Sequence, residues 1–422
     1  MNYVNKVIER YKQDGLVKGT NHGIRCGISR IKRIFIFLLS KLTDVIISAE
    51  KLLPLANYIV FECESDMEDN PRAIYEYLIQ HKLNRSYRMV WIVNDVSFCR
   101  ANYNENNVCF LNRNDYKNIN RIKLNYYFYR SKLFIFSHPY WFKKRKEKQF
   151  VLNTWHGFGM KKLKNSKNDI SNTFDKALVP SQFCKSLFAK DWPIEKLEVM
   201  EYPRQDFLLK GNKREIIRKL LNNYTKFSKI VMCMPTFRQT KNWVDSDRID
   251  QYALGVINDN TELISFNEFL SNNNILIIVK IHPLQSRELL NGNNLSNIIY
   301  INNRDLFKKK VILYELLACC DALLTDVSSV FTDFLMLDRP IGFFMDNVTD
   351  YKRGYIVPNP LELMPGKFIY NPTDLKSFIL DLIEGNDIFS NERIKTYNYL
   401  HSHRDADNSK RVVEWMFHQI GE

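Results

Sequence analysis

Short apolar runs alternate with amphipathic stretches along the chain from residue 57 onward. In DNPRAIYEYLIQH (69–81) the apolar residues have helical spacing, and the pattern places Asn70 as the cap and Pro71 at the first helical position. Strands that alternate with helices favour a parallel α/β fold. The runs that we predict as strands fall into two groups, first 57–64, 87–95, 132–138, 150–155, 176–181 and 197–203, and then 229–237, 275–282, 298–302, 322–326 and 341–345.

The two groups of strands predict two Rossmann-like domains. A chain of 422 residues is long enough for two cores, because a single core usually stops growing at ~250–300 residues. We place the first domain at 53–205 and the second at 206–385, followed by a C-terminal helical segment at 386–422. The break between the domains, QDFLLKGN (205–212), contains Gly211 and is a candidate hinge.

Residues 1–52 differ from the rest of the chain. Up to Arg33 they hold eight basic and two acidic residues, and IFIFLLSKLTDVIISA follows. A membrane-spanning helix needs about 20 mostly apolar residues, whereas Lys41 and Asp44 interrupt this run. We predict a basic amphipathic helix that lies on a membrane surface, and an ordinary packed helix is the alternative. No cleavable signal peptide is predicted.

Charge, cysteine usage and the absence of certain motifs bear on the partner, the compartment and the cofactors. The formal net charge of +14, from 61 Lys+Arg and 47 Asp+Glu, favours an anionic partner such as nucleic acid, a membrane surface or a phosphate-rich substrate. The eight cysteines include no CxxC pair, so we expect reduced core residues in a cytosolic protein. HExxH, GxxxxGK[ST] and GxGxxG are absent, and we expect neither a metal site nor a required metal cofactor.

Four predicted strands end in polar residues that catalysis can use. Because parallel strands bring their carboxyl ends to one crevice, we expect these residues to converge on a phosphate-bearing ligand. Each also has an ordinary structural explanation: a satisfied buried histidine, a surface ion pair for the arginine, and helix caps for the serines. The residues are His156 in NTWHG, Thr236 and Arg238 in PTFR, Lys280 and His282 in KIHP, and Thr325, Asp326, Ser328 and Ser329 in LLTDVSS.

At these motifs the sequence resembles the CDP-glycerol glycerophosphotransferase family, bacterial enzymes that build teichoic acids and related polymers. The resemblance covers about residues 57–415, and its most specific parts are NTWHGFGMKKL, PTFR, KIHP and LLTDVSSVFTDFLMLDRPIGFF. The sequence departs from the family at Phe158 and Gly159, where Thr-Pro is usual, so a changed acceptor pocket is expected.

The resemblance implies a GT-B fold, with an N-terminal acceptor domain and a C-terminal nucleotide-donor domain that face a central cleft. It implies transfer of glycerol phosphate or ribitol phosphate from a CDP-polyol to an undecaprenyl-linked acceptor at the cytoplasmic membrane face, with release of CMP. The family's two histidines fall on His156 and His282. Its donor-binding positions fall on Arg238, Thr325, Ser328 and Ser329.

Basic residues flank the proposed catalytic histidine. They lie in the stretches FKKRKEKQF (142–150) and KKLKNSK (161–167). A run of basic residues in a protein is usually just a solvent-exposed surface. Because these residues lie next to His156, we favour a basic track, a surface that binds a polyanionic acceptor or lipid headgroups. Its candidate residues are Lys143, Lys144, Arg145, Gly157, Lys161 and Lys162.

Three alternative hypotheses compete with a CDP-polyol transferase. A GT-B glycosyltransferase that uses a nucleotide sugar would release a nucleoside diphosphate instead of CMP. A nucleic-acid-binding protein is suggested by the charge alone, and since no recognised binding module is present we expect no nucleic acid partner. An inactive scaffold is disfavoured, because His156, Arg238 and His282 are all retained.

Overall fold

The computed structural model describes most of the chain after residue 40. It covers residues 41–117, 120–138, 148–160, 162, 173–210, 213–221, 224–236, 239–240, 243–244, 252–281, 295–345 and 354–422. The predictions made for 1–40, Gly211, Lys143, Lys144, Arg145, Lys161, Arg238 and His282 lie outside these residues.

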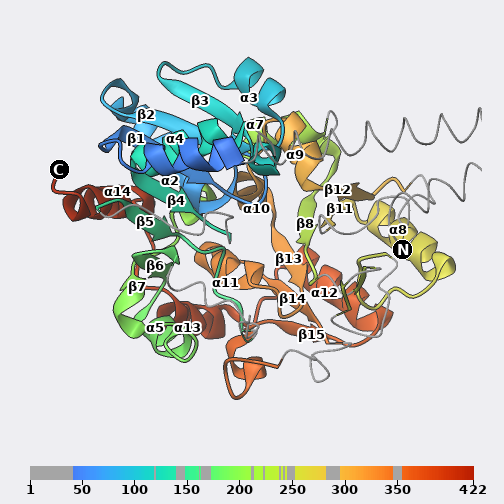
Figure 1. Cartoon of the computed structure of the whole chain (residues 1–422). Coiled ribbons are helices and arrows are strands. Elements are labelled where there is room, and N and C mark those ends of the chain that lie inside the picture. The colour runs from blue at the N-terminus through green and yellow to red at the C-terminus, as the bar shows by residue number, and fades with distance from the viewer. Residues whose placement is uncertain are drawn as a thin grey trace, which may run out of the picture.

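A seven-stranded parallel sheet forms the first domain (Figure 1). Its order is β3-β2-β1-β4-β5-β6-β7, so the chain starts in the centre, builds one edge and then crosses to the other. Its central strands are buried on both faces, as expected for parallel strands covered by helices. The strands are β1 (Ala56–Glu62), β2 (Arg88–Val93), β3 (Val108–Asn112), β4 (Ser131–Phe136), β5 (Phe150–Asn153), β6 (Lys176–Val179) and β7 (Leu197–Val199).

A six-stranded parallel sheet in the order β12-β11-β8-β13-β14-β15 forms the second domain. A short antiparallel hairpin, β9 (Gln239–Thr240) with β10 (Trp243–Val244), follows its first strand. The strands of the sheet are β8 (Lys229–Cys233), β11 (Ile275–Lys280), β12 (Ile298–Ile301), β13 (Ala322–Thr325), β14 (Ile341–Phe344) and β15 (Lys367–Ile369).

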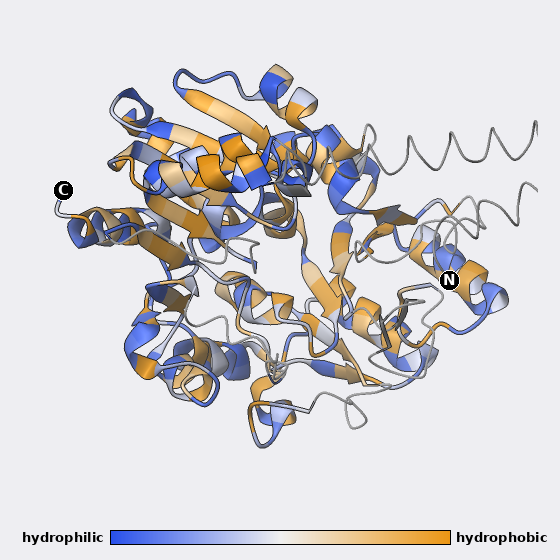
Figure 2. Ribbon diagram, viewed as in Figure 1, coloured by the Kyte–Doolittle hydropathy of each residue, from blue (hydrophilic) through white to orange (hydrophobic). Residues whose placement is uncertain are grey.

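Helices cover both sheets and turn their polar sides outward, while the strands between them are apolar (Figure 2). Residues 41–50 are also helical, and no described helix has the length and apolar character that crossing a bilayer requires. The helices are α2 (Asp69–Gln80), α3 (Val96–Asn102), α4 (Arg121–Arg130), α5 (Gln182–Phe188), α6 (Asp206–Lys210), α7 (Lys213–Leu220), α8 (Asn260–Asn272), α9 (Asn303–Lys308), α10 (Leu313–Cys319), α11 (Val330–Phe334), α12 (Pro372–Glu384), α13 (Ser390–Leu400) and α14 (Asn408–Gln419).

The C-terminal segment returns to the first domain. Helix α13 contacts α5, and α14 contacts α2. Between them, buried His401 bonds through Nδ1 to Glu201 Oε2 at 3.0 Å and through Nε2 to the carbonyl of Thr332 at 2.9 Å. Burial alone would lower the pKa of His401, but the carboxylates of Glu201 and Asp333 outweigh it and raise that pKa. Through these hydrogen bonds the His401 ring joins the two domains and the C-terminal segment.

Every predicted strand is present, and the structure corrects three details. The pattern missed β3, β15 and the hairpin of β9 and β10. Helix α2 begins at Asp69, after an N-cap residue Glu68 that makes no side-chain cap, so Asn70 and Pro71 are the second and third helical residues and not the cap and the first. The Asn70 side chain instead donates to the carbonyls of Thr154 and Trp155. The predicted break at 205–212 contains helix α6.

Candidate active site

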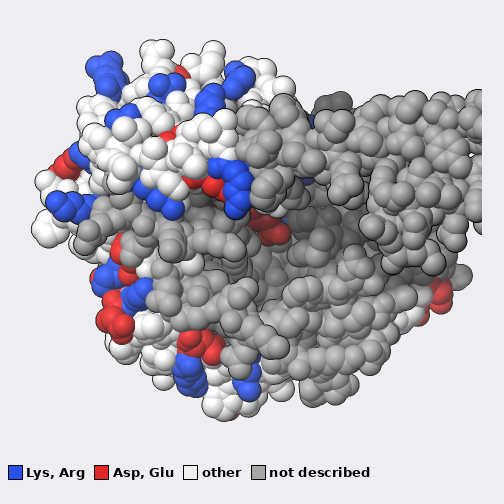
Figure 3. Space-filling view, in the orientation of Figure 1, with Lys and Arg blue, Asp and Glu red and all other residues white. Residues whose placement is uncertain are grey.

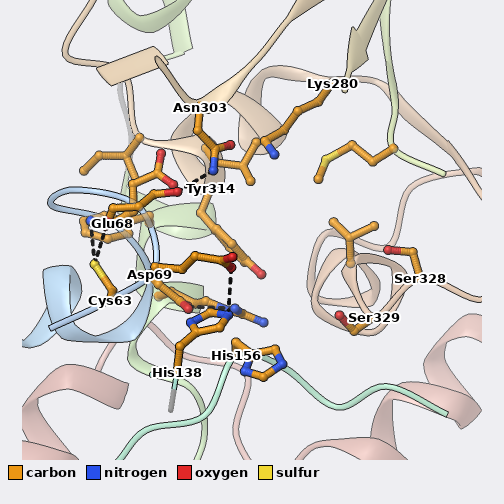
Figure 4. A pocket seen from close by; sticks show the side chains of 18 residues that line it. Cys63, Glu68, Asp69, His138, His156, Lys280, Asn303, Tyr314, Ser328 and Ser329 are labelled. Atoms are coloured by element: carbon orange, nitrogen blue, oxygen red, sulfur yellow. Dashed lines mark hydrogen bonds and ion pairs between the residues drawn. The ribbon is translucent and has the colours of Figure 1, made fainter. Parts of the chain in front are cut away.

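A cavity of about 410 Å³ lies between the two domains at the carboxyl ends of their strands (Figure 4). Its polar wall includes residues that follow β1, β4, β5, β12 and β13, and Lys280 at the end of β11. The strand ends therefore converge as the parallel α/β pattern predicts. The cavity brings together His156, Lys280, Ser328 and Ser329 from the predicted set, together with Glu64, Ser65, Glu68, Asp69, His138, Arg204, Asn303 and Tyr314.

The His156 ring is held in one orientation by the main chain and by aromatic neighbours. Its Nδ1 lies 3.1 Å from the carbonyl oxygen of Ser137 and donates to it, because a carbonyl can only accept. The ring stacks on His138, with the two ring centroids 4.3 Å apart. The centroid of the Trp155 ring lies 4.1 Å from that of His156. This tautomer leaves Nε2 with its lone pair available to take a proton.

Burial and the neighbouring His138 lower the pKa of His156 to about 3. The imidazole is therefore neutral at physiological pH, and Nε2 is unprotonated, but the low pKa makes it a weak base in the free protein. His138 in turn has its Nε2 3.1 Å from the Glu64 carboxylate. The sequence interpretation missed His138, although it ends the strand-like run KLFIFSH.

The turn after His156 depends on Gly157. Its φ is +116°, and a Cβ atom there would lie 2.4 Å from Arg204 Nη2 and 3.3 Å from Ser329 Oγ. Only glycine fits so close an approach in this backbone conformation.

We expect Gly157→Ala to destabilise the protein by more than the ~1–3 kcal/mol of backbone strain alone, because Arg204 and Ser329 must also move. Gly385→Ala is the matched control, since Gly385 has φ +76° but nothing within 4 Å of an added Cβ. Urea denaturation of both variants tests this. Equal losses in the two would show that the contact with Arg204 carries no cost.

Arg204, which the sequence interpretation also missed, joins the two domains beneath His156. Its Nη1 lies 2.7 Å from Asp69 Oδ1, and its Nη2 lies 2.7 Å from Asp333 Oδ2 on α11. Asp333 also accepts hydrogen bonds from the hydroxyl of Tyr314 (2.5 Å) and the amide of Gln205 (2.7 Å). This buried network fixes the floor of the cavity.

Three predicted donor-binding residues support the site instead of lining it. Asp326 Oδ1 accepts from Thr236 N (2.9 Å), Thr236 Oγ1 (2.6 Å) and Ser328 N (3.0 Å), which ties the end of β8 to the end of β13. The fully buried hydroxyl of Thr325 donates to the carbonyl of Met234 at 2.8 Å. Thr325 therefore holds the strand ends together and does not itself face the cavity.

The serines that follow do face the cavity (Figure 4). Neither the Ser328 nor the Ser329 hydroxyl bonds to another residue in the described parts of the chain, and Ser329 makes no side-chain cap. Simple capping, the alternative explanation for these serines, is thus not observed. Helix α11 has only five residues, and the backbone N–H of Ser328 already donates to Asp326. The two hydroxyls are therefore the groups of this wall that could bind an anion.

The two departures from the family pattern lie beside this wall. The Phe158 side chain is fully buried and packs edge-on against Phe188 with centroids 5.9 Å apart. It belongs to the core and is not among the residues that line the cavity, and the altered acceptor pocket expected from the sequence stays a prediction. Lys162 donates its backbone N–H to the carbonyl of Gly354 at 3.1 Å.

Charges of both signs mix over the described part of the face seen in Figure 3. The proposed basic track is not represented there, because most of 142–150 and 161–167 lies outside the described residues. Among the residues that are described, no group of three or more His, Cys, Asp or Glu is arranged to hold a metal ion.

Comparison with known proteins identifies the family. The model for CDP-Glycerol:Poly(glycerophosphate) glycerophosphotransferase matches residues 47–418. A teichoic acid poly(glycerol phosphate) polymerase of Bacillus spizizenii is 27% identical over 92% of this chain and 98% of its own. A teichoic acid glycerol-phosphate transferase of Staphylococcus aureus is 26% identical over 86% and 94%.

The fold is also that of a solved structure. The wall teichoic acid polymerase TagF superposes with a TM-score of 0.73 at 21% identity, covering 94% of this chain and 97% of its own. This agrees with the predicted GT-B arrangement of two parallel-sheet domains around a cleft. With a family match that spans nearly the whole described chain, the protein is a transferase that belongs to the CDP-glycerol:poly(glycerophosphate) glycerophosphotransferase family.

Proposed function

We propose that the protein transfers glycerol phosphate or ribitol phosphate from a CDP-polyol to a hydroxyl of a lipid-linked acceptor, with release of CMP, in the synthesis of teichoic acid or a related polymer. The observation that carries this proposal is one cavity with an unprotonated imidazole nitrogen at His156 and the two hydroxyls of Ser328 and Ser329. A base and an anion-binding wall are the two elements that transfer of a phosphate group to a hydroxyl requires.

In this mechanism Nε2 of His156 takes the proton of the acceptor hydroxyl. The resulting oxygen attacks the β-phosphorus of the donor in line, a new P–O bond forms, and the bond to the oxygen of CMP breaks. Ser328 and Ser329 stabilise the charge on the phosphates, and Lys280 is a further predicted contact of the donor. His282 and Arg238, which lie outside the described residues, remain predicted contacts of the pyrophosphate and the departing CMP.

The proposal includes the predicted division of labour along the chain. Residues 53–205 bind the acceptor and 206–385 bind the nucleotide, and no metal cofactor is assigned a role. We place the protein peripherally on the cytoplasmic membrane face, where its undecaprenyl-linked acceptor is found. Support comes from the helical residues 41–50, on which Leu42 and Val45 are 58% and 66% exposed.

Nucleotide release tests the proposal. Purified protein is given a lipid-linked acceptor with a terminal glycerol phosphate and, in parallel, CDP-glycerol, CDP-ribitol or a nucleotide sugar. We expect acceptor-dependent CMP from one CDP-polyol, and the length of the product then distinguishes addition of one unit from polymerisation. A nucleoside diphosphate released from the sugar donor, with no CMP from either polyol, would establish the glycosyltransferase alternative instead.

A further inference from the structure

Three carboxylates face the cavity from the first domain, and they differ in what they contact. Asp69 pairs with Arg204, and Glu64 pairs with His138. Glu68 has no hydrogen-bond or ion-pair partner for its side chain within the described part of the chain, and its Oε1 is buried. Of the three carboxylates, Glu68 is therefore the one whose oxygens can still accept hydrogen bonds from a ligand.

A second open acceptor lies in the same part of the cavity. The Asn303 amide donates through Nδ2 to Ser65 Oγ at 2.5 Å, whereas its Oδ1 is buried without a donor among the described residues. In Figure 4, Glu68, Asn303 and Lys280 lie together on the side of the cavity away from His156 and Ser329. Buried acceptors without donors are costly in a folded protein, so a pair of them in one cavity points to a ligand that supplies donors.

The charges of this region restrict the chemistry of that ligand. Burial raises the pKa of Glu68 to about 7, and the nearby ammonium of Lys280 partly opposes this rise. Lys280 is nevertheless not close enough to Glu68 to form an ion pair with it. An anionic phosphate would be repelled by Glu68, and a cationic ligand would be repelled by Lys280. Neutral hydroxyls fit best, because they donate to the two open oxygens and accept from the lysine.

We propose that Glu68, Asn303 and Lys280 form a subsite that binds the free hydroxyls of a polyol unit. The subsite rests on the proposed function, and it divides the cavity into a hydroxyl-binding side at Glu68 and a phosphate-binding side at Ser328 and Ser329. Hydroxyls of this kind occur in two places, on the polyol of the CDP-polyol donor and on the terminal unit of the acceptor.

Glu68→Gln in the full-length protein tests the proposal. Calorimetric titration with the CDP-polyol that the parent enzyme uses, and with CMP, isolates the contribution of the polyol, and steady-state kinetics gives KM for the acceptor. If the donor polyol occupies the subsite, its dissociation constant rises about tenfold while that of CMP is unchanged. If the acceptor does, KM for the acceptor rises about tenfold and donor affinity stays constant.

Two further variants complete the experiment. Asn303→Ala should weaken the same ligand to a smaller extent. Glu76→Gln removes a carboxylate from the same helix, where it pairs with Arg72 outside the cavity, and should change neither constant.

The possible failures are distinguishable. A parent protein that releases no CMP from either CDP-polyol would remove the proposed function and the subsite together. An active parent with unchanged donor affinity and acceptor KM in Glu68→Gln would overturn the subsite alone. Equal loss of CMP and CDP-polyol binding would also overturn it, because CMP has no polyol to lose.

Discussion

Replacing His156 with alanine is expected to lower kcat by about 10²–10⁴-fold, the usual contribution of a general base, while the dissociation constant of the CDP-polyol changes little. The reason is the position of its free nitrogen. Nδ1 is occupied by the Ser137 carbonyl, so Nε2 is the nitrogen that we propose takes the proton of the acceptor hydroxyl. In the proposed mechanism the phosphates bind elsewhere, at Ser328 and Ser329, which line the same cavity.

Single-turnover CMP release and donor titration separate the two effects. His81→Ala is a suitable control, since His81 is an exposed histidine that stacks on Tyr77 outside the cavity. Unchanged turnover in His156→Ala would remove His156 from the role of base. A parallel loss of donor affinity would make it a binding residue instead.

The low pKa of His156, about 3 in the free protein, has a consequence for the pH profile. The imidazole stays neutral across the range from pH 5 to 8, so kcat/KM should show no acid limb from His156 there. Binding of the anionic donor brings negative charge next to the ring and raises its pKa. The acid limb of kcat, which reports the bound complex, should therefore lie at a higher pH than any limb of kcat/KM from this group.

The parallel architecture could be predicted because it depends on local pattern. Apolar strand runs and the polar residues that end them are neighbours in sequence, so NTWHG and KIHP indicated the crevice without knowledge of the fold. The predicted roles of Lys280, Ser328 and Ser329 remain proposals, but the structure does bring them to one cavity with His156.

The missed features depend on contacts between distant residues. Arg204 and Asp333 are 129 positions apart, and neither belongs to a local motif that sets it apart from a surface charge. The motif made Thr325 a predicted donor contact, and its hydroxyl donates to the carbonyl of Met234 at the end of the neighbouring strand β8, while its role toward the donor stays a prediction. Asn70 resembled a helix cap by local rules, whereas tertiary contacts with Thr154 and Trp155 decide its position.

The largest expected effect on stability comes from Asp333→Ala. The carboxylate of Asp333 is fully buried and accepts from Arg204, Gln205 and Tyr314. Its removal leaves a buried guanidinium with Asp69 alone and takes the acceptor from two further donors. Breaking a buried ion pair from one side costs about 3–5 kcal/mol, and we expect a loss of that size in the free energy of unfolding.

Urea denaturation measures the loss, and a second substitution tests its cause. Arg204→Met combined with Asp333→Ala removes the uncompensated charge, so the double variant should be more stable than Asp333→Ala alone. Asp405→Ala is the control, since Asp405 pairs with Arg411 on the surface at 2.8 Å, and exposed pairs contribute about 0–1 kcal/mol. A loss below about 1 kcal/mol in Asp333→Ala would show that water reaches Arg204, and that the two domains are held together by packing and not by this charge network.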